Sequence, residues 1–382
     1  MRSVTIVGAS LAGLSSARAL REQGFDGRIT MIGDEIHRPY DRPPLSKQFL
    51  KGIDDGMSLE TEEDSALELD FRLGNAAVGL DPSGRAVLLA DWTEVLSDAV
   101  VVATGASAIR LAGSADGVHV LRSLDDALAL RAELTPGARV VVVGAGFIGS
   151  EVASTAVELG CDVTVVEASV SPLERVFGTQ IGALVAGWHN RGGAHLITGV
   201  TVSGFAMSSG RVTAVELRDG RLLPADVVVV GVGSRPNTRW LDGSGIELSG
   251  GVVTDKRGVT SIPGVVAVGD CAAVRDPATG TTFRDEHWTA AATRPAVAMK
   301  ALLGSGVETF SGVPYVWSDQ YQSRIQFAGH HGLDCSADIV EGDPELGPFV
   351  AVYRRDGHPV AVLAVSSPRS FGKWRRQLVA RD

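Results

Sequence analysis

Two segments of the chain place glycines at a fixed spacing directly after a run of β-branched residues. Residues 4–13 read VTIVGASLAG and residues 140–149 read VVVVGAGFIG. In such a turn the first glycine permits a sharp bend, the second lets backbone N–H groups approach a pyrophosphate, and the third lets the helix pack closely on the strand. One copy is a weak signal, but two copies predict two bound dinucleotides and transfer of reducing equivalents between them.

The two copies are not equivalent, because the first lacks the middle glycine. The glycines are Gly8 and Gly13 in the first copy and Gly144, Gly146 and Gly149 in the second. Ser10 takes the middle place in the first copy; it adds a side chain there but keeps its N–H available, so the turn should still bind a phosphate. Further cofactor contacts are expected from Leu11, Ala12, Phe147 and Ile148. For either turn taken alone, the alternative is a tight connection in an unrelated α/β protein.

Acidic residues follow the second strand of each copy, where a carboxylate normally binds the adenosine ribose hydroxyls. Glu167 ends the strand VTVV in the second copy. In the first copy Gly33 has the equivalent place, and Asp34 and Glu35 come next; of these two we prefer Asp34. No Arg or Lys is adjacent to Glu167, so the 2′-phosphate of NADPH would lack a partner and NADH is favoured over NADPH. Solvated strand ends are the alternative for these acids.

The composition is that of an α/β protein with two or three domains. The chain has 382 residues, of which 46 are glycine, and with strong valine runs this indicates many tight strand-to-helix turns. No segment approaches the roughly 18 apolar residues that span a bilayer. The first strand also begins too early for a signal peptide, so we expect a cytoplasmic protein without a membrane partner. The net charge of −10 argues against nucleic acid as the main partner.

Each copy is expected to form a βαβ unit. The expected strands are residues 4–7 and 28–32 in the first copy and 140–143 and 163–166 in the second, with helices that end near 24 and 160. Further strands that stop at glycine are expected within 97–105, 225–233 and 262–270. A helix interrupted by Pro295 should cover about 286–303, and short alternating strands follow from 307.

This order predicts two Rossmann-like domains, one inserted into the other, and a small C-terminal α+β domain. The expected boundaries are 1–110 and 237–306 for the split domain, 111–236 for the inserted domain and 307–382 for the C-terminal domain.

Several short segments carry a resemblance to a known family. They are RPPLSK at 42–47, ATG at 103–105, LRSLDDA at 121–127, GFIGSE at 146–151, GD at 269–270, EHW at 286–288 and WSDQ at 317–320. In these the chain resembles the oxygenase-coupled ferredoxin reductases, and RPPLSK is the most specific match. The resemblance implies that the split domain binds FAD and the inserted domain binds NADH. It also implies that electrons pass singly to an iron–sulfur ferredoxin that serves a cytochrome P450 or a Rieske oxygenase.

The resemblance further implies which side chains contact the cofactors. These residues are Arg42, Pro44, Lys47, Thr104, Gly105, Arg122, Glu151, Gly233, Gly269, Asp270, His287, Trp288 and Trp317. Asp270 would bond to the ribityl or pyrophosphate part of FAD, with a simple helix N-cap as its alternative. His287 and Trp288 open a helix whose dipole would stabilise the reduced flavin. Trp288 and Trp317 would cover the flavin or the nicotinamide; ordinary core packing is their alternative.

Lys47 and Glu151 are the candidate catalytic residues. The family places these two residues together beside the reactive edge of the flavin. An ammonium group there would stabilise the negative charge that develops as hydride arrives, and the carboxylate would hold the lysine and orient the nicotinamide carboxamide. An ion pair that merely bridges two domains is the alternative.

Cysteine usage excludes one related class. A disulfide reductase built on the same plan needs a redox cysteine pair, but residues 42–47 contain none, and Cys161, Cys271 and Cys335 have neither that spacing nor a metal-ligand spacing. Electrons must therefore leave directly from the flavin, to a protein carrier, a quinone, another small oxidant or oxygen.

Two other function classes stay open at this point. One is a single-component flavin NAD(P)H oxidase or monooxygenase, and the other is a redox-sensing protein that resembles apoptosis-inducing factor. A ferredoxin is usually acidic, so docking would need a basic surface. The candidates are Arg369, Lys373, Arg375, Arg376 and Arg381, and a solvated helix face is their alternative.

Overall fold

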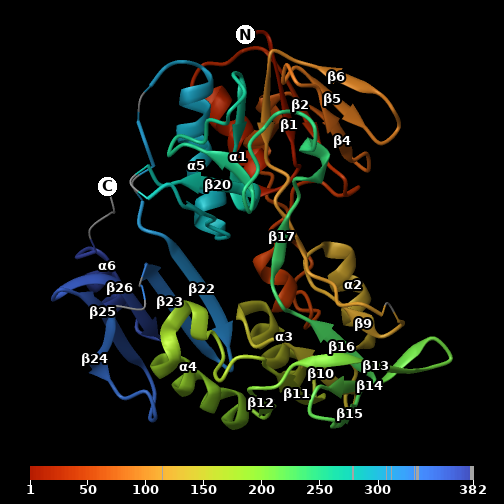
Figure 1. Cartoon of the computed structure of the whole chain (residues 1–382), viewed down its shortest axis with the longest axis vertical. Coiled ribbons are helices and arrows are strands. Elements are labelled where there is room, and N and C mark those ends of the chain that lie inside the picture. The colour runs from red at the N-terminus through yellow and green to blue at the C-terminus, as the bar shows by residue number, and fades with distance from the viewer. Residues whose placement is uncertain are drawn as a thin grey trace.

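Two parallel five-stranded sheets form the centres of the two larger parts of the computed structural model (Figure 1). The structure describes residues 1–113, 115–277, 279–306, 308–310, 312–330, 332 and 335–378. The first sheet has the order β19-β7-β1-β2-β3 and the second has the order β12-β11-β10-β16-β9. Their strands are β1 Ser3–Val7, β2 Arg28–Ile32, β3 Leu69–Arg72, β7 Ala99–Val102, β19 Val265–Ala267, β9 Val118–His119, β10 Arg139–Val143, β11 Asp162–Val166, β12 His195–Ile197 and β16 Val227–Val230.

Both expected βαβ units are present. Helix α1 (Leu11–Glu22) connects β1 to β2, and helix α3 (Phe147–Glu158) connects β10 to β11. The β-branched runs at the sheet centres are buried on both faces, as parallel strands covered by other elements must be. The predicted α/β class with two Rossmann-like units is confirmed.

The chain returns to the first sheet after it has built the second. Strand β19 pairs in parallel with β7, so the first sheet combines segments from both sides of the second. The chain passes between the two parts through β8 (Ala106–Ala108) and β17 (Ser234–Pro236), which pair with each other and lie between the parts in Figure 1. Strands β8 and β17 lie beside the domain boundaries that we expected from the sequence. We retain those boundaries as a proposal.

Three smaller sheets and the remaining helices complete the two larger parts. The sheets are β4 Ala77–Leu80, β5 Ala86–Leu89 and β6 Glu94–Leu96; β13 Val202–Ser208, β14 Arg211–Leu217 and β15 Leu222–Pro224; and β18 Val252–Thr254, β20 Ala272–Arg275 and β21 Thr282–Phe283. The helices are α2 Leu124–Glu133, α4 Glu174–Arg191 and α5 Trp288–Leu302, and short 3-10 turns are η1 Pro43–Ser46, η2 Glu62–Leu67, η3 Arg239–Leu241 and η4 Gly269–Cys271. Among the described residues no helix is long and apolar enough to cross a membrane.

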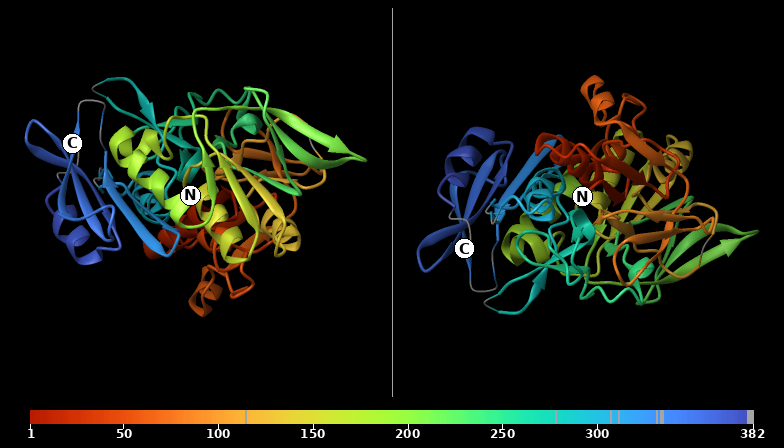
Figure 2. Two further views of the ribbon diagram at one scale, coloured as in Figure 1. Left: turned by 90° about the horizontal axis from the view of Figure 1, so that it is seen from below. Right: turned by 90° about the horizontal axis from the view of Figure 1, so that it is seen from above.

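The C-terminal domain is an antiparallel sheet of order β22-β23-β26-β25-β24 at one side of the molecule (Figure 2). Its strands are β22 Tyr315–Gln320, β23 Ser323–Gly329, β24 Ser336–Gly342, β25 Phe349–Arg355 and β26 His358–Val365. Helix α6 (Pro368–Arg375) packs on one face through Phe371. Helix α4 packs on the opposite face through Phe177 and Ile181, and this contact had no counterpart among the sequence-based expectations.

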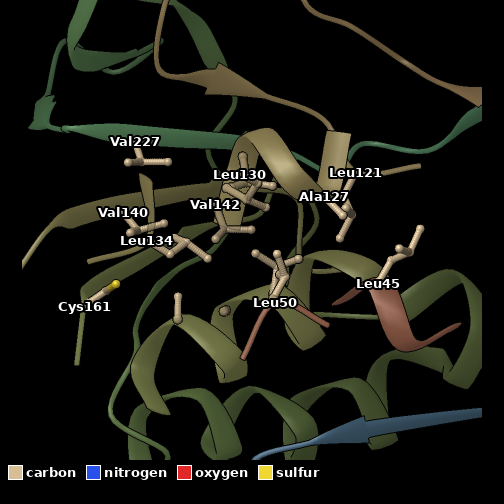
Figure 3. Close-up of a cluster of buried hydrophobic side chains, with 14 of the residues drawn as sticks. Leu45, Leu50, Leu121, Ala127, Leu130, Leu134, Val140, Val142, Cys161 and Val227 are labelled. Atoms are coloured by element: carbon tan, nitrogen blue, oxygen red, sulfur yellow. The ribbon is translucent and has the colours of Figure 1, made fainter. Parts of the chain in front are cut away.

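Turn η1 and the segment that follows it are anchored in the core of the second part. Leu45 and Leu50 pack with Ala127 and Leu130 of α2 and with Val142 of β10 (Figure 3). The segment belongs by sequence to the first part, but its apolar side chains are buried against the second. This packing fixes the backbone on both sides of residue 47.

One buried histidine in α4 gives a prediction for the pH dependence of stability. Burial lowers the pKa of His189 to about 4, whereas an unfolded histidine has a pKa of about 6.5. Between these values the unfolded chain binds a proton that the folded chain does not, so stability falls as the pH falls. From pH 7 to pH 5 this group should remove about 2 kcal/mol of unfolding free energy. The variant His189→Asn keeps a polar side chain but cannot bind this proton. Its unfolding free energy should therefore fall by less than that of wild type between pH 7 and pH 5.

Urea unfolding of the FAD-loaded protein at pH 7 and pH 5 measures this difference. The Arg-paired carboxylates Asp64 and Asp226 have pKa values of about 2 and therefore titrate below this window. Equal pH dependence in wild type and variant would contradict a neutral buried His189.

Candidate functional site

A cleft of about 1250 Å³ lies between the two larger parts and is lined by both glycine turns. Its size exceeds the roughly 300–1,000 Å³ of a pocket for one drug-sized ligand. All site residues expected from sequence line this cleft except Gly13 and Pro44. The cleft therefore brings together side chains that are up to about 310 residues apart in the chain, from Gly8 to Trp317.

The two exceptions have structural places beside the cleft. A Cβ atom at Gly13 would lie 1.9 Å from the carbonyl oxygen of Gly8, so Gly13 lets α1 pack on the end of β1. Pro44 was expected to line the flavin, but its neighbour Pro43 lines the cleft instead. The carbonyl of Pro44 accepts hydrogen bonds from the N–H groups of Lys47 and Phe49, so Pro44 shapes the turn that presents Lys47.

The first glycine of each turn is required by conformation and by space. Gly8 has φ +125° and Gly144 has φ +100°, both in the region that favours glycine. A Cβ at Gly8 would lie 2.0 Å from the Ala103 oxygen, and one at Gly144 would lie 2.4 Å from the Gly231 oxygen. The same close approach in both units explains the shared sequence signature.

The second position of each turn faces the cleft. A Cβ at Gly146 would meet nothing within 4 Å, which leaves open space where a phosphate would approach. In the first turn the Ser10 hydroxyl accepts a hydrogen bond from Nε of Arg42 at 3.4 Å. Helices α1 and α3 begin here without a side-chain cap, so their first N–H groups remain available to an anion.

The acidic residues near the two turns differ in their partners. Glu167 accepts hydrogen bonds from the N–H of Ala145 at 2.7 Å and of Ser169 at 2.8 Å, and it lines the cleft beside the second turn. Glu35 is bound by Arg42 at 2.6 Å. Asp34 is exposed at the cleft, so it remains our proposal for the ribose of the first dinucleotide.

Lys47 and Glu151 are in direct contact on the wall of the cleft. Nζ of Lys47 lies 2.6 Å from Oε2 of Glu151, and both side chains are largely buried. The same carboxylate accepts hydrogen bonds from the hydroxyls of Ser46 at 2.5 Å and Ser318 at 2.6 Å. The hydroxyl of Thr155 donates to the carbonyl of Ser46 at 2.8 Å, which ties the lysine turn to α3. Glu151 thus joins the first part, the second part and the C-terminal domain.

Two arginines also connect the two parts at the cleft. Nη2 of Arg122 lies 2.6 Å from Oδ2 of Asp270, directly after β19 and Gly269. Nη1 of Arg42 donates to the carbonyl of Arg122 at 2.6 Å. Two guanidinium groups therefore line the cleft, and groups of this kind bind phosphate and other oxygen acceptors.

The start of α5 supplies aromatic side chains to the cleft. His287 stands at the N-cap position of α5 without a side-chain cap hydrogen bond, and burial lowers its pKa. Trp288 begins the helix and donates from Nε1 to Asp41 at 2.7 Å. Its ring meets that of Trp317 edge-on at 5.9 Å, and Tyr315 stacks on Trp317 at 5.8 Å.

Sequence reasoning did not single out some of the residues that make these contacts, and four of them matter most for the Glu151 carboxylate and the aromatic side chains. These four residues are Ser46, Ser318, Asp41 and Tyr315. Ser46 and Ser318 lie inside the RPPLSK and WSDQ segments, so the local motif marked the region but not the hydroxyls. Nothing in the sequence pairs Asp41 with a tryptophan 247 positions away.

The described part of the chain offers neither a metal centre nor a thiol at the cleft. No group of His, Cys, Asp and Glu among the described residues could hold a metal ion. Cys161 and Cys271 are buried, and burial raises the pKa of both thiols. Neither lines the cleft.

Comparison with known proteins gives matches over the whole length. Residues 2–301 match the family described as pyridine nucleotide-disulphide oxidoreductase, and residues 315–382 match the family described as reductase C-terminal. The chain is 36% identical to a probable ferredoxin reductase CtmF of Castellaniella defragrans, over 99% of this chain and 94% of that protein. It is also 36% identical to the ferredoxin–NAD(+) reductase subunit of the benzene 1,2-dioxygenase system of Pseudomonas putida, over 99% and 92%. A chain in the crystal structure of the covalent putidaredoxin reductase–putidaredoxin complex superimposes with a TM-score of 0.92 at 31% identity, covering 98% of this chain and 92% of that one.

Proposed function

The chain belongs to the pyridine nucleotide-disulphide oxidoreductase family and carries a reductase C-terminal domain, and from this we propose that it is the FAD-dependent NADH:ferredoxin reductase of an oxygenase system. Relatives of similar length are named as ferredoxin reductase components of dioxygenase systems. The oxygenase that receives electrons from the ferredoxin would be a cytochrome P450 or a Rieske enzyme.

The residues of the cleft fit both cofactors. The turn at Gly8, with Arg42, Lys47 and the distant Asp270, would hold FAD, and the turn at Gly144 with Glu167 would hold NADH. Open space at Gly146 and the uncapped starts of α1 and α3 suit two pyrophosphates. When bound, FAD accepts a hydride from NADH and gives up the two electrons one at a time.

The contribution of the protein is positioning and electrostatics. Lys47 would hold a positive charge where negative charge develops during hydride transfer, and this charge acts strongly because the side chain is largely buried. Glu151 fixes the ammonium group and is itself fixed by Ser46 and Ser318. The contact of Lys47 with Glu151, in a cleft without a cysteine among its lining residues, is the observation that carries the proposal.

Ferredoxin would dock where the aromatic edge of the cleft meets the basic helix α6. Trp288 is 38% exposed and contacts Trp317, on which Tyr315 stacks. The guanidinium of Arg375 lies over Tyr315 at 4.8 Å. The exposed basic residues of α6 and of the position directly after it are Arg369, Lys373, Arg375 and Arg376. Arg381, the remaining basic candidate, lies outside the described residues.

Reversing charge on α6 should weaken the interaction with an acidic ferredoxin. In Arg375→Glu/Arg376→Glu, KM for ferredoxin should rise by about tenfold at low salt, and the difference from wild type should shrink as salt screens the charges. Ferredoxin reduction, expressed relative to ferricyanide reduction by the same enzyme, is the measurement. Arg218→Glu/Arg221→Glu is the matched control, because both arginines are exposed in the β14–β15 turn of the second part and the change of net charge is the same. Equal effects of the two changes would contradict docking at α6.

Steady-state turnover separates the proposal from the two other classes. A ferredoxin reductase should reduce cytochrome c rapidly only when a suitable ferredoxin is added. An NADH oxidase or monooxygenase would form peroxide rapidly with little dependence on ferredoxin, and a redox sensor would bind NADH but turn over slowly with every acceptor. We also propose that the protein works in the cytoplasm, where NADH is supplied.

A further inference from the structure

A tyrosine of the C-terminal domain is inserted into the second large part of the molecule. Tyr321 lies in the turn between β22 and β23 but packs against the hydrophobic core that contains β10 and α3. Its hydroxyl lies 2.7 Å from Nδ1 of His189 on α4, and the two rings meet edge-on at 5.2 Å. Its backbone N–H donates to the hydroxyl of Ser154 on α3 at 2.8 Å. Tyr321 is therefore bound by both helices that flank it.

The backbone is strained to achieve this insertion. Tyr321 has φ +48° and Gln322 has φ +62°, so both central residues of a two-residue hairpin adopt the left-handed conformation that favours Asn and Gly. The end of α4 also leaves room for the ring, since a Cβ at Gly192 would lie 2.1 Å from the tyrosine ring. The strained β22–β23 turn and the matching gap at the end of α4 indicate that the contact between them is specific.

The protonation states of the two partners suit a permanent hydrogen bond. Burial lowers the pKa of His189, which keeps the imidazole neutral with one nitrogen able to accept. Burial raises the pKa of Tyr321, which keeps its hydroxyl protonated as a donor.

The inserted turn directly continues the strand that reaches the Lys47 and Glu151 pair. Ser318, three residues before Tyr321 on β22, donates to Oε1 of Glu151 at 2.6 Å. Nε2 of Gln320 donates to the Ser318 hydroxyl at 2.9 Å. Trp317, which directly precedes Ser318 on β22, lines the cleft. A shift of the hairpin would therefore move a hydroxyl that binds the buried carboxylate.

We infer that Tyr321 is a positioning residue for hydride transfer: it locks the β22–β23 hairpin between α3 and α4, and through Ser318 it holds Glu151 and hence Lys47 in place. This inference rests on the proposed function, because it assigns Tyr321 to the NADH-dependent step at the same site. The hairpin gives the C-terminal domain a part in the first half-reaction, separate from any contact with ferredoxin.

A double-mutant cycle on flavin reduction tests the inference. Tyr321→Phe keeps the ring in the core and removes only the hydroxyl, and Ser318→Ala removes the hydroxyl on Glu151. The rate constant for anaerobic bleaching of bound FAD at saturating NADH is measured for wild type, both single variants and the double variant. Tyr321→Phe should slow bleaching by about fivefold in wild type and by less than about twofold in the Ser318→Ala background, since the two changes act through one contact.

Tyr353→Phe is the matched control. Tyr353 is also a buried tyrosine of the C-terminal domain, and its hydroxyl also binds α4, by donating to the carbonyl of Phe177 at 2.8 Å. Its removal should lower the melting temperature without changing the bleaching rate. The inference would be overturned if Tyr321→Phe slowed bleaching equally in both backgrounds. It would also be overturned if Tyr321→Phe, like the control, lowered the melting temperature and left the bleaching rate unchanged. The readout needs no ferredoxin, so failure of wild type to reduce ferredoxin would reject the proposed function and leave this result interpretable.

Discussion

Replacement of Lys47 by alanine is expected to slow the reduction of bound FAD by NADH by roughly 100-fold, the typical loss when one buried stabilising donor is removed from a reacting centre. The Lys47 side chain is only 11% exposed and lies 2.6 Å from the Glu151 carboxylate, so little water could replace its charge. FAD binding should change much less, because the glycine turn, Arg42 and Asp270 remain. Anaerobic stopped-flow bleaching gives the rate, and the FAD content of the purified protein gives the binding.

Lys51 provides the control for loss of a lysine at this junction. Nζ of Lys51 lies 2.5 Å from Glu158, so it also links the turn after η1 to α3, but it does not line the cleft. Lys51→Ala should bleach at the wild-type rate. If Lys47→Ala does so too, the contact with Glu151 is a structural bridge between domains and has no catalytic share.

Replacement of Glu167 by arginine should change the preferred nicotinamide nucleotide. The carboxylate stands beside the second glycine turn, where it would bind the ribose hydroxyls of NADH and repel a 2′-phosphate. Arginine would pair with that phosphate and lose the ribose contact. We expect the ratio of kcat/KM for NADPH to that for NADH to rise by roughly 100-fold. Initial rates of ferricyanide reduction with each nucleotide measure this ratio.

Asp162→Arg makes the same change of charge at the opposite end of the same strand. Asp162 begins β11 and is exposed, whereas Glu167 directly follows its end. The control should leave the nucleotide ratio unchanged. A similar rise in both variants would show that the overall charge, rather than a contact to the ribose, sets the preference.

The regular part of the fold could be predicted from sequence because it depends on local signals. The valine runs of β1 and β10, with glycines at fixed distances after them, specify strand, turn and helix without reference to the rest of the chain. The return of the chain to the first sheet through β19 was predicted for the same reason, since that strand also ends at a glycine.

The contacts within the site could be predicted only in part. The resemblance paired Lys47 with Glu151, but the donors on that carboxylate come from Ser46 and Ser318, which tertiary folding alone brings together. The packing of α4 on the C-terminal sheet escaped prediction because its apolar face matches a surface built more than 130 residues later. Pro43 rather than Pro44 lines the cleft, and a motif could not show this because it gives residue types, not the direction in which each side chain points in a 3-10 turn.

One single-turnover experiment shows whether the reduced flavin passes its electrons to a ferredoxin. The FAD-loaded enzyme is reduced anaerobically with one equivalent of NADH and then mixed with excess oxidised iron–sulfur ferredoxin. We expect the flavin to be reoxidised as two equivalents of ferredoxin are reduced. The assignment as a ferredoxin reductase would be contradicted if the flavin stayed reduced in the presence of ferredoxin and was reoxidised only by oxygen, with formation of peroxide.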